Sequence, residues 1–560
     1  MAAYIAIQSF AVSAPYFLMD DAQELVHVRG MGSWLQLFGA DGFHLFRPVK
    51  NILFAFFSLF PEDMTWVCRV TGITIGCISL FPVVSFFRRV FGDERRTLLA
   101  AATWMLAPTL VSSVAWLSCV NIQVMCAFGA LAIVFHDKAF GEDRSRCLYV
   151  AWAAVCIFLA CVSYEQAVAV GPIVILFDFY LNPARIRSKR TFPAYVVYAV
   201  VSIFYLILRG MVGSVSALNG SFDHVSRLDI ALASAYFTCQ HFFVWIWPFG
   251  NMSPAGSYSA GNVSLFVLVG CWLTVLALVS FSLVMRRRIP LVAMGIAISL
   301  MGFLPVSNVL GFGNGPYGDY YMGLPSMGLS IMFVAIVELI CASGGRLGLV
   351  RFTFVVLLLA SRIFAIPEAA RWAWLWADGA RSFASGIEAF PSAFSNRQFY
   401  ARVCYESGRI DDAIKCCEWL ESHLHPESEQ LTIVFQIKAL IALNVARDPK
   451  VAMSNLAAAL RVDKKGVSRR VTKYYRGCVF EDLLGDEKSA ESEYREAISG
   501  KWNADTPAAA DRLARLLAIR GELDVAETLW AKGARCRPDD DSIRHNLLQL
   551  RRVKAEGKEL

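Results

Sequence analysis

Two adjacent carboxylates, Asp20 and Asp21, directly follow an apolar segment at residues 2–19. Acidic side chains at the edge of a bilayer cost free energy, so their presence there indicates a functional role. Either carboxylate could act as a general base and take the proton of an acceptor hydroxyl. The alternative interpretation is a solvated acidic pair at the end of a helix, and the residues alone leave both open.

The loop after the acid pair contains His44 and Arg47 within HLFRPVK, residues 44–50. A guanidinium group can bind two phosphate oxygens at once, which makes Arg47 a candidate ligand for a phosphate. An arginine whose side chain reaches up to lipid headgroups is the competing interpretation. His44 is a weaker candidate, because an interfacial position explains a histidine as well as catalysis does.

Glu165 lies in SYEQ, residues 163–166, at a short turn between two apolar segments. An ionisable residue at membrane depth is a candidate functional residue. If the turn is exposed, Glu165 is an ordinary solvated loop residue instead.

Composition indicates what kind of scaffold positions these residues. The chain has 560 residues, of which 56% are hydrophobic and 18% are charged, and its mean hydropathy is +0.48. These values exclude a purely soluble protein, and an aromatic content of 13% excludes a disordered one. A net charge of +7 is expected in the loops of a membrane protein, so no nucleic-acid partner is needed. The 15 cysteines form no CxxC pair or Cys/His cluster, so no zinc site is expected.

A membrane span needs about 20 apolar residues. Eleven segments approach that length, and the first is expected to be a span and not a cleaved signal peptide, because it lacks a basic start. Two further apolar segments, 44–60 and 228–249, are expected to be interfacial or re-entrant. The eleven expected spans are residues 1–19, 64–87, 97–117, 120–136, 147–164, 166–181, 193–211, 262–285, 290–309, 322–343 and 349–367.

Lysine and arginine are distributed unequally over the loops between these segments. One set of loops is rich in them, and the opposite set carries only Arg29, Arg47, Lys50 and Arg227. The positive-inside rule assigns the basic set to the cytoplasm. An odd number of spans from a cytoplasmic start then leaves the C-terminal region outside. The basic set of loops comprises residues 88–96, 138–146, 185–190, 286–288 and 346.

Beyond about residue 370 the sequence changes to charged, alanine-rich amphipathic segments. Four alanines recur there at intervals of 39, 38 and 36 residues, and three of them follow a glycine by five residues. This period is typical of degenerate tetratricopeptide repeats, in which each unit is a pair of antiparallel helices. An irregular helical bundle is the alternative. The four alanines are Ala413, Ala452, Ala490 and Ala526.

Residues 303–328 read FLPVSNVLGFGNGPYGDYYMGLPSMG. This segment resembles a late exterior loop of the tetratricopeptide-repeat transmembrane protein O-mannosyltransferases and of their bacterial relatives. Other similarities to this family follow in the same order along nearly the whole chain. They are the acid pair at 20–21, FRPV at 46–49, YEQAVAVGPIVILFDF at 164–179, FFVWIWPFGNMSP at 242–254 and RW at 371–372 before the repeats.

The resemblance implies a polytopic glycosyltransferase fold of the GT-C type and a polyprenyl-phosphate sugar as donor. It favours Asp20, the first acid of the pair, as the general base, and it assigns Asp319 and Tyr320 to donor binding together with His44, Arg47 and Glu165. The chain departs from the family at two places. It has GD at 318–319 where the family usually has Glu-Arg, and tyrosine at 164 where lysine is usual, so positive charge is lost at both.

The expected fold is all-α: a membrane helical bundle over residues 1–370, followed by a tetratricopeptide-like repeat domain over residues 371–560. The expected function is an inverting transfer of a sugar from polyprenyl phosphate to an exported protein hydroxyl or a surface glycan. Arg47 would hold the phosphate, Asp21 would orient the acceptor or raise the pKa of Asp20, and the acceptor would bind the repeats. No cofactor is implied, since the lipid-linked sugar is a substrate.

Topology favours a lipid-linked donor independently, because nucleotide sugars are cytoplasmic and the expected site is outside. The expected location is a bacterial inner membrane with the repeats in the periplasm, or the endoplasmic reticulum membrane with lumenal repeats in a eukaryote. Two other functions compete: a membrane-anchored repeat scaffold without catalysis, and a transporter. Charges at exterior turns speak against a transporter, whose sites lie midway along broken helices. A transferase predicts that Asp20, Asp21 and Arg47 converge, and a scaffold predicts that they diverge into solvent.

Overall fold

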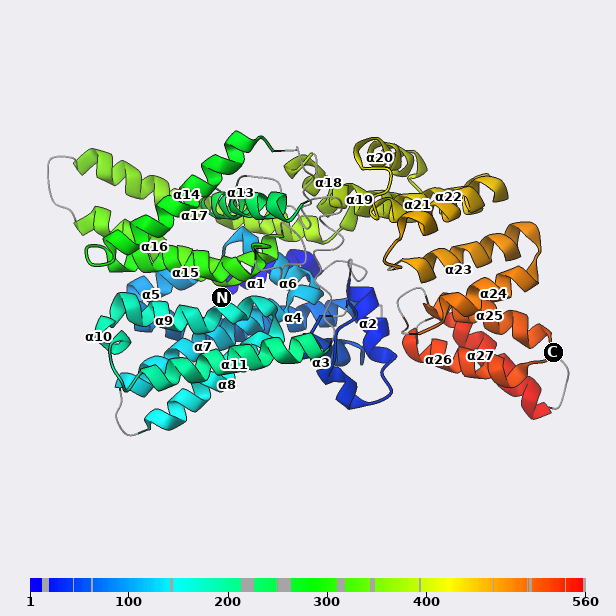
Figure 1. The fold of residues 1–560 in the computed structure, drawn as a ribbon, viewed down its shortest axis with the longest axis horizontal. Coiled ribbons are helices and arrows are strands. Elements are labelled where there is room, and N and C mark those ends of the chain that lie inside the picture. Colours follow the sequence, from blue (N-terminus) through cyan, green and yellow to red (C-terminus); the bar gives the residue numbers. More distant parts are fainter. Residues whose placement is uncertain are drawn as a thin grey trace.

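In the computed structural model, all regular elements of the described residues are helical. The helices form two regions along the long axis of the molecule (Figure 1): a bundle of apolar helices, and a succession of shorter helices, α18 to α27, beyond one end of it. The structure describes residues 1–12, 20–43, 45–61, 64–141, 145–212, 226–247, 249, 263–309, 318–342, 348–391, 394–466, 468–500, 502, 506–538 and 540–556.

Among the described residues, seven helical stretches are long and apolar enough to cross a membrane, and an eighth is a pair bent by 60°, formed by Glu94–Met105 (α5) and Pro108–Ala115 (η3 and α6). They correspond one for one to eight of the eleven expected spans. The seven are Thr65–Phe91 (α4), Leu117–Gly141 (η4 and α7), Arg146–Ser163 (α8), Phe192–Met211 (α11), Leu265–Met285 (α14), Asp319–Ala342 (η7 and α16) and Phe352–Trp376, the main part of α17 (Gly348–Trp376).

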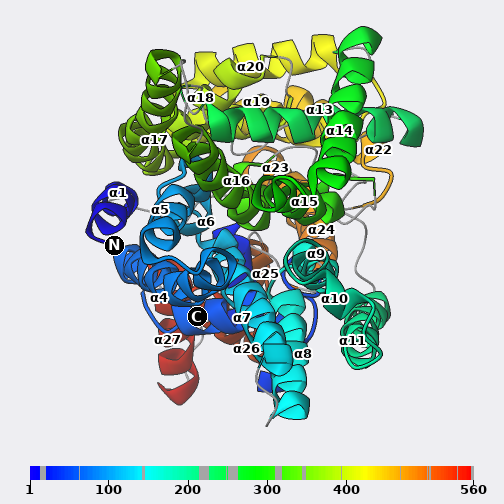
Figure 2. The ribbon, with the colours of Figure 1, turned by 90° about the vertical axis from the view of Figure 1, so that its left-hand side faces the viewer.

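The other three expected spans are shorter apolar helices in the described residues. They are α1 (Ala2–Val12), the pair η5 (Glu165–Ala169) and α9 (Val170–Leu181), and α15 (Pro290–Phe303) with η6 (Leu304–Val306). Residues 13–19 of the first expected span lie outside the described residues. Figure 2 looks along the helices and shows α1 at the periphery of the bundle, where it packs against α4 and α17.

The two segments expected to be interfacial or re-entrant are single helices. α3 (Pro48–Phe57) is a short apolar helix, and α13 (Arg227–Ile246) is one continuous helix without the break that a re-entrant segment needs. α13 packs along α14 and is not among the helices apolar enough to cross.

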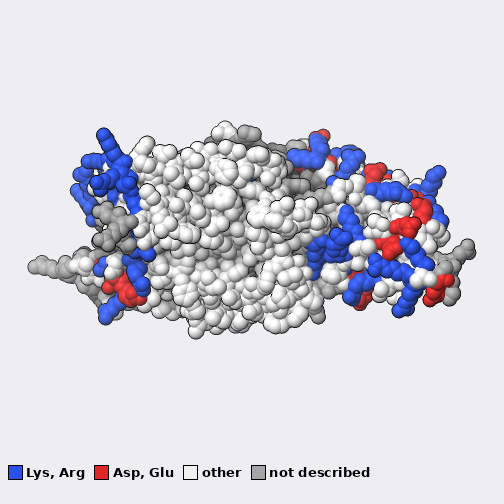
Figure 3. Space-filling view, turned by 90° about the horizontal axis from the view of Figure 1, so that it is seen from below, with Lys and Arg blue, Asp and Glu red and all other residues white. Residues whose placement is uncertain are grey.

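The distribution of charge distinguishes the two ends of the bundle. Figure 3 shows mostly Lys and Arg side chains, with a small acidic group among them, at one end, a broad face without charged residues, and both signs spread over the other end, where the repeats lie. At the first end, Asp137 on α7 pairs with Arg89 on α4 and with Arg185 on α10 (Pro183–Ile186), at 3.0 and 2.8 Å. We call this the arginine-rich end, and the opposite end the α2 side.

Beyond α18 (Gly379–Ala389), helices pair in sequence order and each pair packs on the next. Ala413, Ala452, Ala490 and Ala526 lie in the first turn of the second helix of each pair, and none has any exposed surface. The helices are α19 (Phe394–Glu406), α20 (Ile410–His423), α21 (Leu431–Ile441), α22 (Pro449–Val462), α23 (Arg469–Val479), α24 (Glu487–Ala497), α25 (Thr506–Ile519), α26 (Leu523–Cys536) and the final α27 (Asp541–Glu556).

The turn inside each pair is left-handed. Gly408, Gly485 and Gly521 have φ of 76°, 65° and 85°, and Arg447 has φ of 56° at the corresponding place in the second pair. Each lies five residues before its alanine, which explains the glycine–alanine spacing in the sequence. Glycine adopts this conformation without steric cost, so Arg447 is the strained member of the series.

Candidate functional site

The acid pair begins α2 (Asp21–Arg29), a helix on the side of the bundle that faces the repeats. Asp20 occupies the N-cap position, and Asp21 and Glu24 lie in the first turn, where the helix dipole favours negative charge. Asp21 is fully buried, and its Oδ1 accepts hydrogen bonds from the backbone N–H and the hydroxyl of Ser118, at 2.9 and 2.7 Å. Asp20 is half-buried and so is the more accessible carboxylate.

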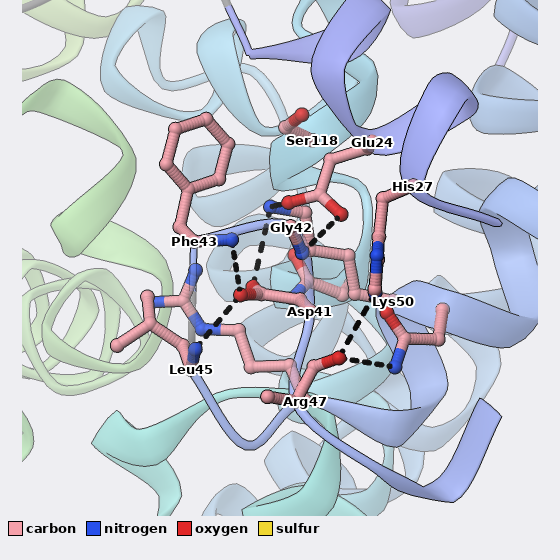
Figure 4. Close-up of polar contacts among 12 residues, drawn as sticks. Glu24, His27, Asp41, Gly42, Phe43, Leu45, Arg47, Lys50 and Ser118 are labelled. Carbon is pink, nitrogen blue, oxygen red and sulfur yellow. Dashed lines mark hydrogen bonds and ion pairs between the residues drawn. The ribbon is translucent and has the colours of Figure 1, made fainter. Parts of the chain in front are cut away.

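Lys50 lies in the first turn of α3 and is almost completely buried. Its Nζ lies 2.8 Å from Glu24 and 3.5 Å from Asp41, so two acids from one loop and one helix converge on a single cation (Figure 4). Backbone N–H groups complete the arrangement: Glu24 accepts from Gly42 at 3.0 Å, and Asp41 accepts from Leu45 at 2.8 Å.

Arg47 directly precedes Pro48, which starts α3. Its Nε and Nη2 donate to the two carboxylate oxygens of Glu165, at 2.7 and 2.5 Å, and both side chains are buried. The guanidinium also lies 4.3 Å from the centre of the Tyr164 ring. The two-pronged face expected to bind phosphate is therefore directed at Glu165 in this structure.

Aromatic rings adjoin the Arg47 pair. Tyr320 meets Trp116 edge-on, with centroids 5.4 Å apart, and Trp116 stacks on Trp376 at 5.7 Å. Tyr320 and Tyr321 are also in ring contact, at 4.5 Å. Asp319 is buried immediately before Tyr320, on η7 (Asp319–Met322), which packs against η3 and α6.

Two buried donors in this region have no hydrogen-bond partner among the described residues: the hydroxyl of Tyr164 and the indole N–H of Trp116. Both side chains are at most 5% exposed. An unsatisfied buried donor costs roughly 1–3 kcal/mol, so both are candidates to bind a group that is not part of the chain.

Burial raises the pKa of Asp20 to about 6, and the nearby Lys50 opposes this rise. Asp21 and Asp41 raise the pKa of Asp20 further, and Arg47 lowers it. The pKa of Glu24 is likewise raised by burial to about 7, against the effect of Lys50. A carboxylate with a pKa near 6 is ionised at neutral pH and is a stronger base than an exposed aspartate.

Two other carboxyls show the opposite shift. Burial would raise the pKa of Glu165, but the charge and hydrogen bonds of Arg47 hold it below its ordinary value. Burial would also raise the pKa of Asp41, but the charges of Lys50 and Arg47 hold it below its ordinary value. Both are therefore fixed negative charges, which makes them counter-ions for the two cations and poor proton acceptors.

Short turns hold these elements together. Gln166 on η5 donates to the carbonyls of Gly302 and Tyr321, both at 2.8 Å, which ties η5 to the ends of α15 and η7. Asn121 at the start of α7 donates to the carbonyl of Ser163 at 2.7 Å. All of these contacts lie on the α2 side of the bundle.

The repeats reach the same place. Val26 on α2 packs in one apolar cluster with Trp502, Ala510 and Cys536, the last of these on α26. A Cβ atom placed on Gly30 would lie 3.6 Å from Sγ of Cys536. The helix that carries the acid pair is therefore supported by the last helix pair of the repeats.

An apolar cavity of about 300 Å³ opens inside the bundle, between α9, α13, α14 and α15. Its wall includes Tyr180, on the half of α9 towards the arginine-rich end, and Phe303 and Ser307, next to η6. η6 packs on η5, the turn that contains Glu165. The η6 part of the cavity wall therefore packs on the turn that contains Glu165, and the rest of the wall is formed mainly by the apolar helices.

The sequence-derived candidates have different outcomes in the structure. Asp20, Asp21 and Arg47 lie in one cluster, since the charges of Asp21 and Arg47 both act on Asp20. Glu165 joins it through Arg47, and Tyr164 lies close enough to Tyr320 to act on it electrostatically. His44 lies outside the described residues. The described residues contain no group of three or more His, Cys, Asp and Glu arranged to hold a metal ion.

Sequence reasoning missed Glu24, Asp41 and Lys50 as site residues. Lys50 was visible only as one of four basic residues in the poorly basic set of loops. The signal that could have found it is a lysine at the third position of a ten-residue apolar helix, since such a charge is buried only beside a partner. Nothing in the local sequence pairs Lys50 with Glu24 or Asp41.

Comparisons with known proteins add little to this description. No family model matches the sequence, and no curated protein matches it. Among solved structures, a thermophilic tetratricopeptide-repeat protein of Thermus thermophilus matches with 22% identity and a TM-score of 0.25. The match covers 34% of this chain and 95% of that protein.

Proposed function

We propose that this chain is a membrane glycosyltransferase that moves a sugar from a polyprenyl-phosphate donor to a hydroxyl of an exported protein or a surface glycan. The observation that carries the proposal is the burial of Asp21, Arg47 and Lys50 on the α2 side of the bundle, where the charges of all three act on Asp20. Charged groups are gathered at the edge of an apolar bundle at a cost in solvation free energy, which a functional site explains.

Asp20 is the general base in this proposal. Its carboxylate takes the proton of the acceptor hydroxyl while the oxygen attacks the anomeric carbon of the sugar. The bond between that carbon and the phosphate oxygen breaks, and polyprenyl phosphate leaves with the bonding electrons. Attack opposite to the leaving group inverts the configuration at that carbon. Asp21, held by Ser118, positions Asp20 and the acceptor.

The phosphate of the lipid-linked sugar needs hydrogen-bond donors that are not already engaged by other groups. Arg47 keeps Glu165 as its bidentate partner, so its contribution is through the N–H groups that point away from Glu165. The hydroxyl of Tyr164, which lies against the Arg47 guanidinium, is a buried donor without a partner among the described residues. We assign the phosphate to the Arg47 and Tyr164 side of the cluster.

The apolar cavity supports a lipid-linked donor. It begins next to η6 and η5 and is lined mainly by apolar side chains of α9, α13, α14 and α15. An isoprenoid chain buries only apolar surface, so an apolar cavity whose wall packs on the turn that contains Glu165 suits such a donor.

The compartment is part of the proposal. The arginine-rich end faces the cytoplasm by the positive-inside rule, so the α2 side and the repeats face the exterior, in the periplasm or the lumen. The repeats then provide the surface for the acceptor. The competing proposal, a scaffold without catalysis, expects Asp20, Asp21 and Arg47 to diverge into solvent, and the burial of Asp21 and Arg47 is the observation against it.

The decisive experiment compares exported glycoproteins and surface glycans by mass spectrometry in cells with and without the gene. Wild type and Asp541→Asn should restore the modification, whereas Asp20→Asn should not, because it removes the base and keeps the shape. Asp541 is the matched control: an aspartate with a 92% exposed side chain on α27. A general base contributes roughly 10²–10⁴-fold to a rate. Full restoration by both Asp20→Asn and Asp21→Asn would falsify the catalytic role of the pair and favour the scaffold.

A further inference from the structure

Three apolar side chains point outward from η1 (Trp34–Phe38), a single turn between α2 and α3. Trp34, Leu35 and Phe38 are 68%, 62% and 54% exposed, and Trp34 and Phe38 are in edge-to-face contact. Leu37 on the same turn faces the other way, into the cluster under α2 and α3. We call the three outward side chains the η1 patch.

The segment around the η1 patch contains no charge, since residues 30–40 include none of Asp, Glu, Lys and Arg. A loop that projects into water has no reason to present three large apolar side chains without an interspersed charge. Both a protein partner and a bilayer could cover such a patch, so a second observation must choose between them.

The backbone hydrogen bonds of this segment favour a bilayer over a protein partner. Four of its N–H groups bond within the segment: Gly32 to the side chain of Gln36, Leu35 to the hydroxyl of Ser33, and Gln36 and Gly39 to carbonyls three residues back. The amide of Asn51 on α3 bonds the carbonyls of Leu37 and Gly39 from below. Lipid requires polar backbone groups to be satisfied by the chain, whereas water does not.

The position of the segment agrees with a lipid surface. η1 packs on α3, and α3 packs on α7 and α8, helices apolar enough to cross a membrane. Figure 1 shows α2 and α3 between the bundle and the repeats, at the level where the bundle ends. Tryptophan and other aromatic side chains are enriched at this level of membrane proteins.

We propose that the η1 patch inserts into the leaflet on the α2 side of the membrane. The inference rests on the membrane bundle and is independent of the proposed glycosyltransferase activity. It names phospholipid as the partner, because a self-bonded, uncharged turn beside spanning helices suits a bilayer better than it suits a soluble protein.

Insertion of the η1 patch into the leaflet would fix the depth of the polar cluster relative to the membrane surface. Asn51, which holds the η1 segment, follows Lys50 in the chain, and the segment itself leads into Asp41. The lysine and the acids around it are therefore linked through a few rigid bonds to a turn that lies in the lipid. A substrate carried by a lipid would reach the cluster without leaving the membrane surface.

Fluorescence quenching in phosphatidylcholine nanodiscs tests the inference on the full-length protein. Leu35→Cys is labelled with a small fluorophore, in a background where the exposed Cys147 and Cys341 are replaced by serine. Leu357→Cys on α17 and Leu548→Cys on α27 are the matched controls, with 61% and 58% exposure in the bundle and in the repeats. The quencher is phosphatidylcholine with a nitroxide near the glycerol end of its chain.

We expect quenching at Leu35 to approach that at Leu357 and to exceed that at Leu548 several-fold. Quenching no greater than at Leu548 overturns the inference, whatever the cause. If this low quenching at Leu35 is accompanied by a doubled protein mass in the nanodisc, a second copy of the chain covers the η1 patch. Phe38→Cys provides a second position, so a labelling failure at Leu35 leaves the test intact. The activity of the protein does not enter the measurement, so failure here and failure of the proposed function are separate results.

Discussion

Lys50 is the charge around which the acids of α2 and its loop gather. It pairs with Glu24 and Asp41 and lowers the pKa of Asp20, whereas Asp21 is held separately by Ser118. The four acids, Asp20, Asp21, Glu24 and Asp41, thus have different environments although they lie close together. Asp20, a half-buried residue, is the acid of α2 whose pKa burial raises to about 6, which suits a general base at neutral pH.

The raised pKa of Asp20 predicts how stability changes with pH. The carboxyl releases its proton near 3.8 in the unfolded chain and near 6 in the folded chain. The stability that this group contributes is complete below pH 3.8 and is lost as the pH rises through 6. Asp20→Asn removes that loss, so the unfolding temperature of the variant, relative to wild type, should be higher above pH 6 than below pH 3.8.

Thermal unfolding of the purified protein across this pH range measures the effect. Asp541→Asn, on the exposed end of α27, should show no such dependence. A pH-independent difference between Asp20→Asn and wild type would mean that the pKa of Asp20 is ordinary. The same pKa predicts that transfer by the wild type weakens as the pH falls below 6.

Arg47→Lys tests the bidentate pair with Glu165. Lysine keeps the charge but cannot form two parallel hydrogen bonds or stack on Tyr164 in the same way. We expect the free energy of unfolding to fall by about 1.5–3 kcal/mol, the range for one hydrogen bond to a charged group, together with weaker donor use. Arg402→Lys, in an exposed pair with Glu406, is the control and should change neither. Unchanged stability and activity in Arg47→Lys would show that the two parallel hydrogen bonds from Arg47 to Glu165 are dispensable.

The candidate site was partly predictable from the sequence for a physical reason. A charge at a membrane edge is conspicuous because it is costly, and this singled out Asp20, Asp21, Arg47 and Glu165. Which charge pairs with which is decided by packing between distant segments. The Arg47–Glu165 pair joins positions 118 residues apart, and no local pattern predicts it.

At the scale of elements, apolar runs predicted where helices lie better than how long they are. All eleven expected spans contain a helix, but three of those helices are short. In two cases a turn is the cause, since η5 precedes α9 and η6 ends α15. Such turns follow from tertiary contacts, such as the bonds of Gln166 to Gly302 and Tyr321, and leave little trace in hydropathy.

The repeat turns give a prediction at this scale. Arg447 has the left-handed conformation that glycine has in the other three pairs, and its side chain is exposed. Arg447→Gly should raise the free energy of unfolding by about 0.5–1 kcal/mol, because the relief of strain exceeds the added freedom of the unfolded chain. Thermal unfolding of the full-length protein measures it.

The opposite substitution at an equivalent turn is the control. Gly485→Ala places a side chain at φ of 65° with no neighbour within 4 Å, so only backbone strain changes and stability should fall. If Arg447→Gly is instead destabilising, the arginine side chain makes a contact whose value exceeds the strain.

At the scale of the whole molecule, the elements close a ring. The chain leaves the bundle through α17 and α18, passes through the four repeat pairs, and returns through α26 to α2. Trp376 at the end of α17 stacks on Trp116, and Cys536 on α26 lies against α2. Both ends of the repeat array are therefore fixed beside the polar cluster.

Gly30→Cys tests the closure directly. The new side chain would lie close to the native thiol of Cys536, within reach of a disulfide after a small rotation. We expect mild oxidation to form this crosslink, seen as a disulfide-linked peptide pair after digestion. Gly32→Cys, which has open space around it, should remain uncrosslinked. Equal crosslinking at both positions would contradict the packing of α26 on α2.

The orientation in the membrane gives the last prediction. Lys450 on α22 should lie on the same side as Asp20, because the basic loops lie at the opposite end. A membrane-impermeant maleimide should label Lys450→Cys in intact cells or spheroplasts. The same reagent should label Arg187→Cys, at the arginine-rich end, only after permeabilisation. The reverse pattern would end the assignment of the repeats to the exterior.

The packing of α26 on α2 also has a consequence for synthesis. Residues 26 and 536 meet in the folded chain, so the acid helix emerges from the ribosome long before its support exists. At about 5–20 residues per second, the intervening 500 or so residues take roughly 25–100 s to make. The bundle can insert during that time and α2 can pack on α3, but the contact of α2 with α26 forms only when the last repeat is complete. A truncation that removes only α26 and α27 would leave every residue of the polar cluster in the chain and still remove the contact of its helix with the repeats.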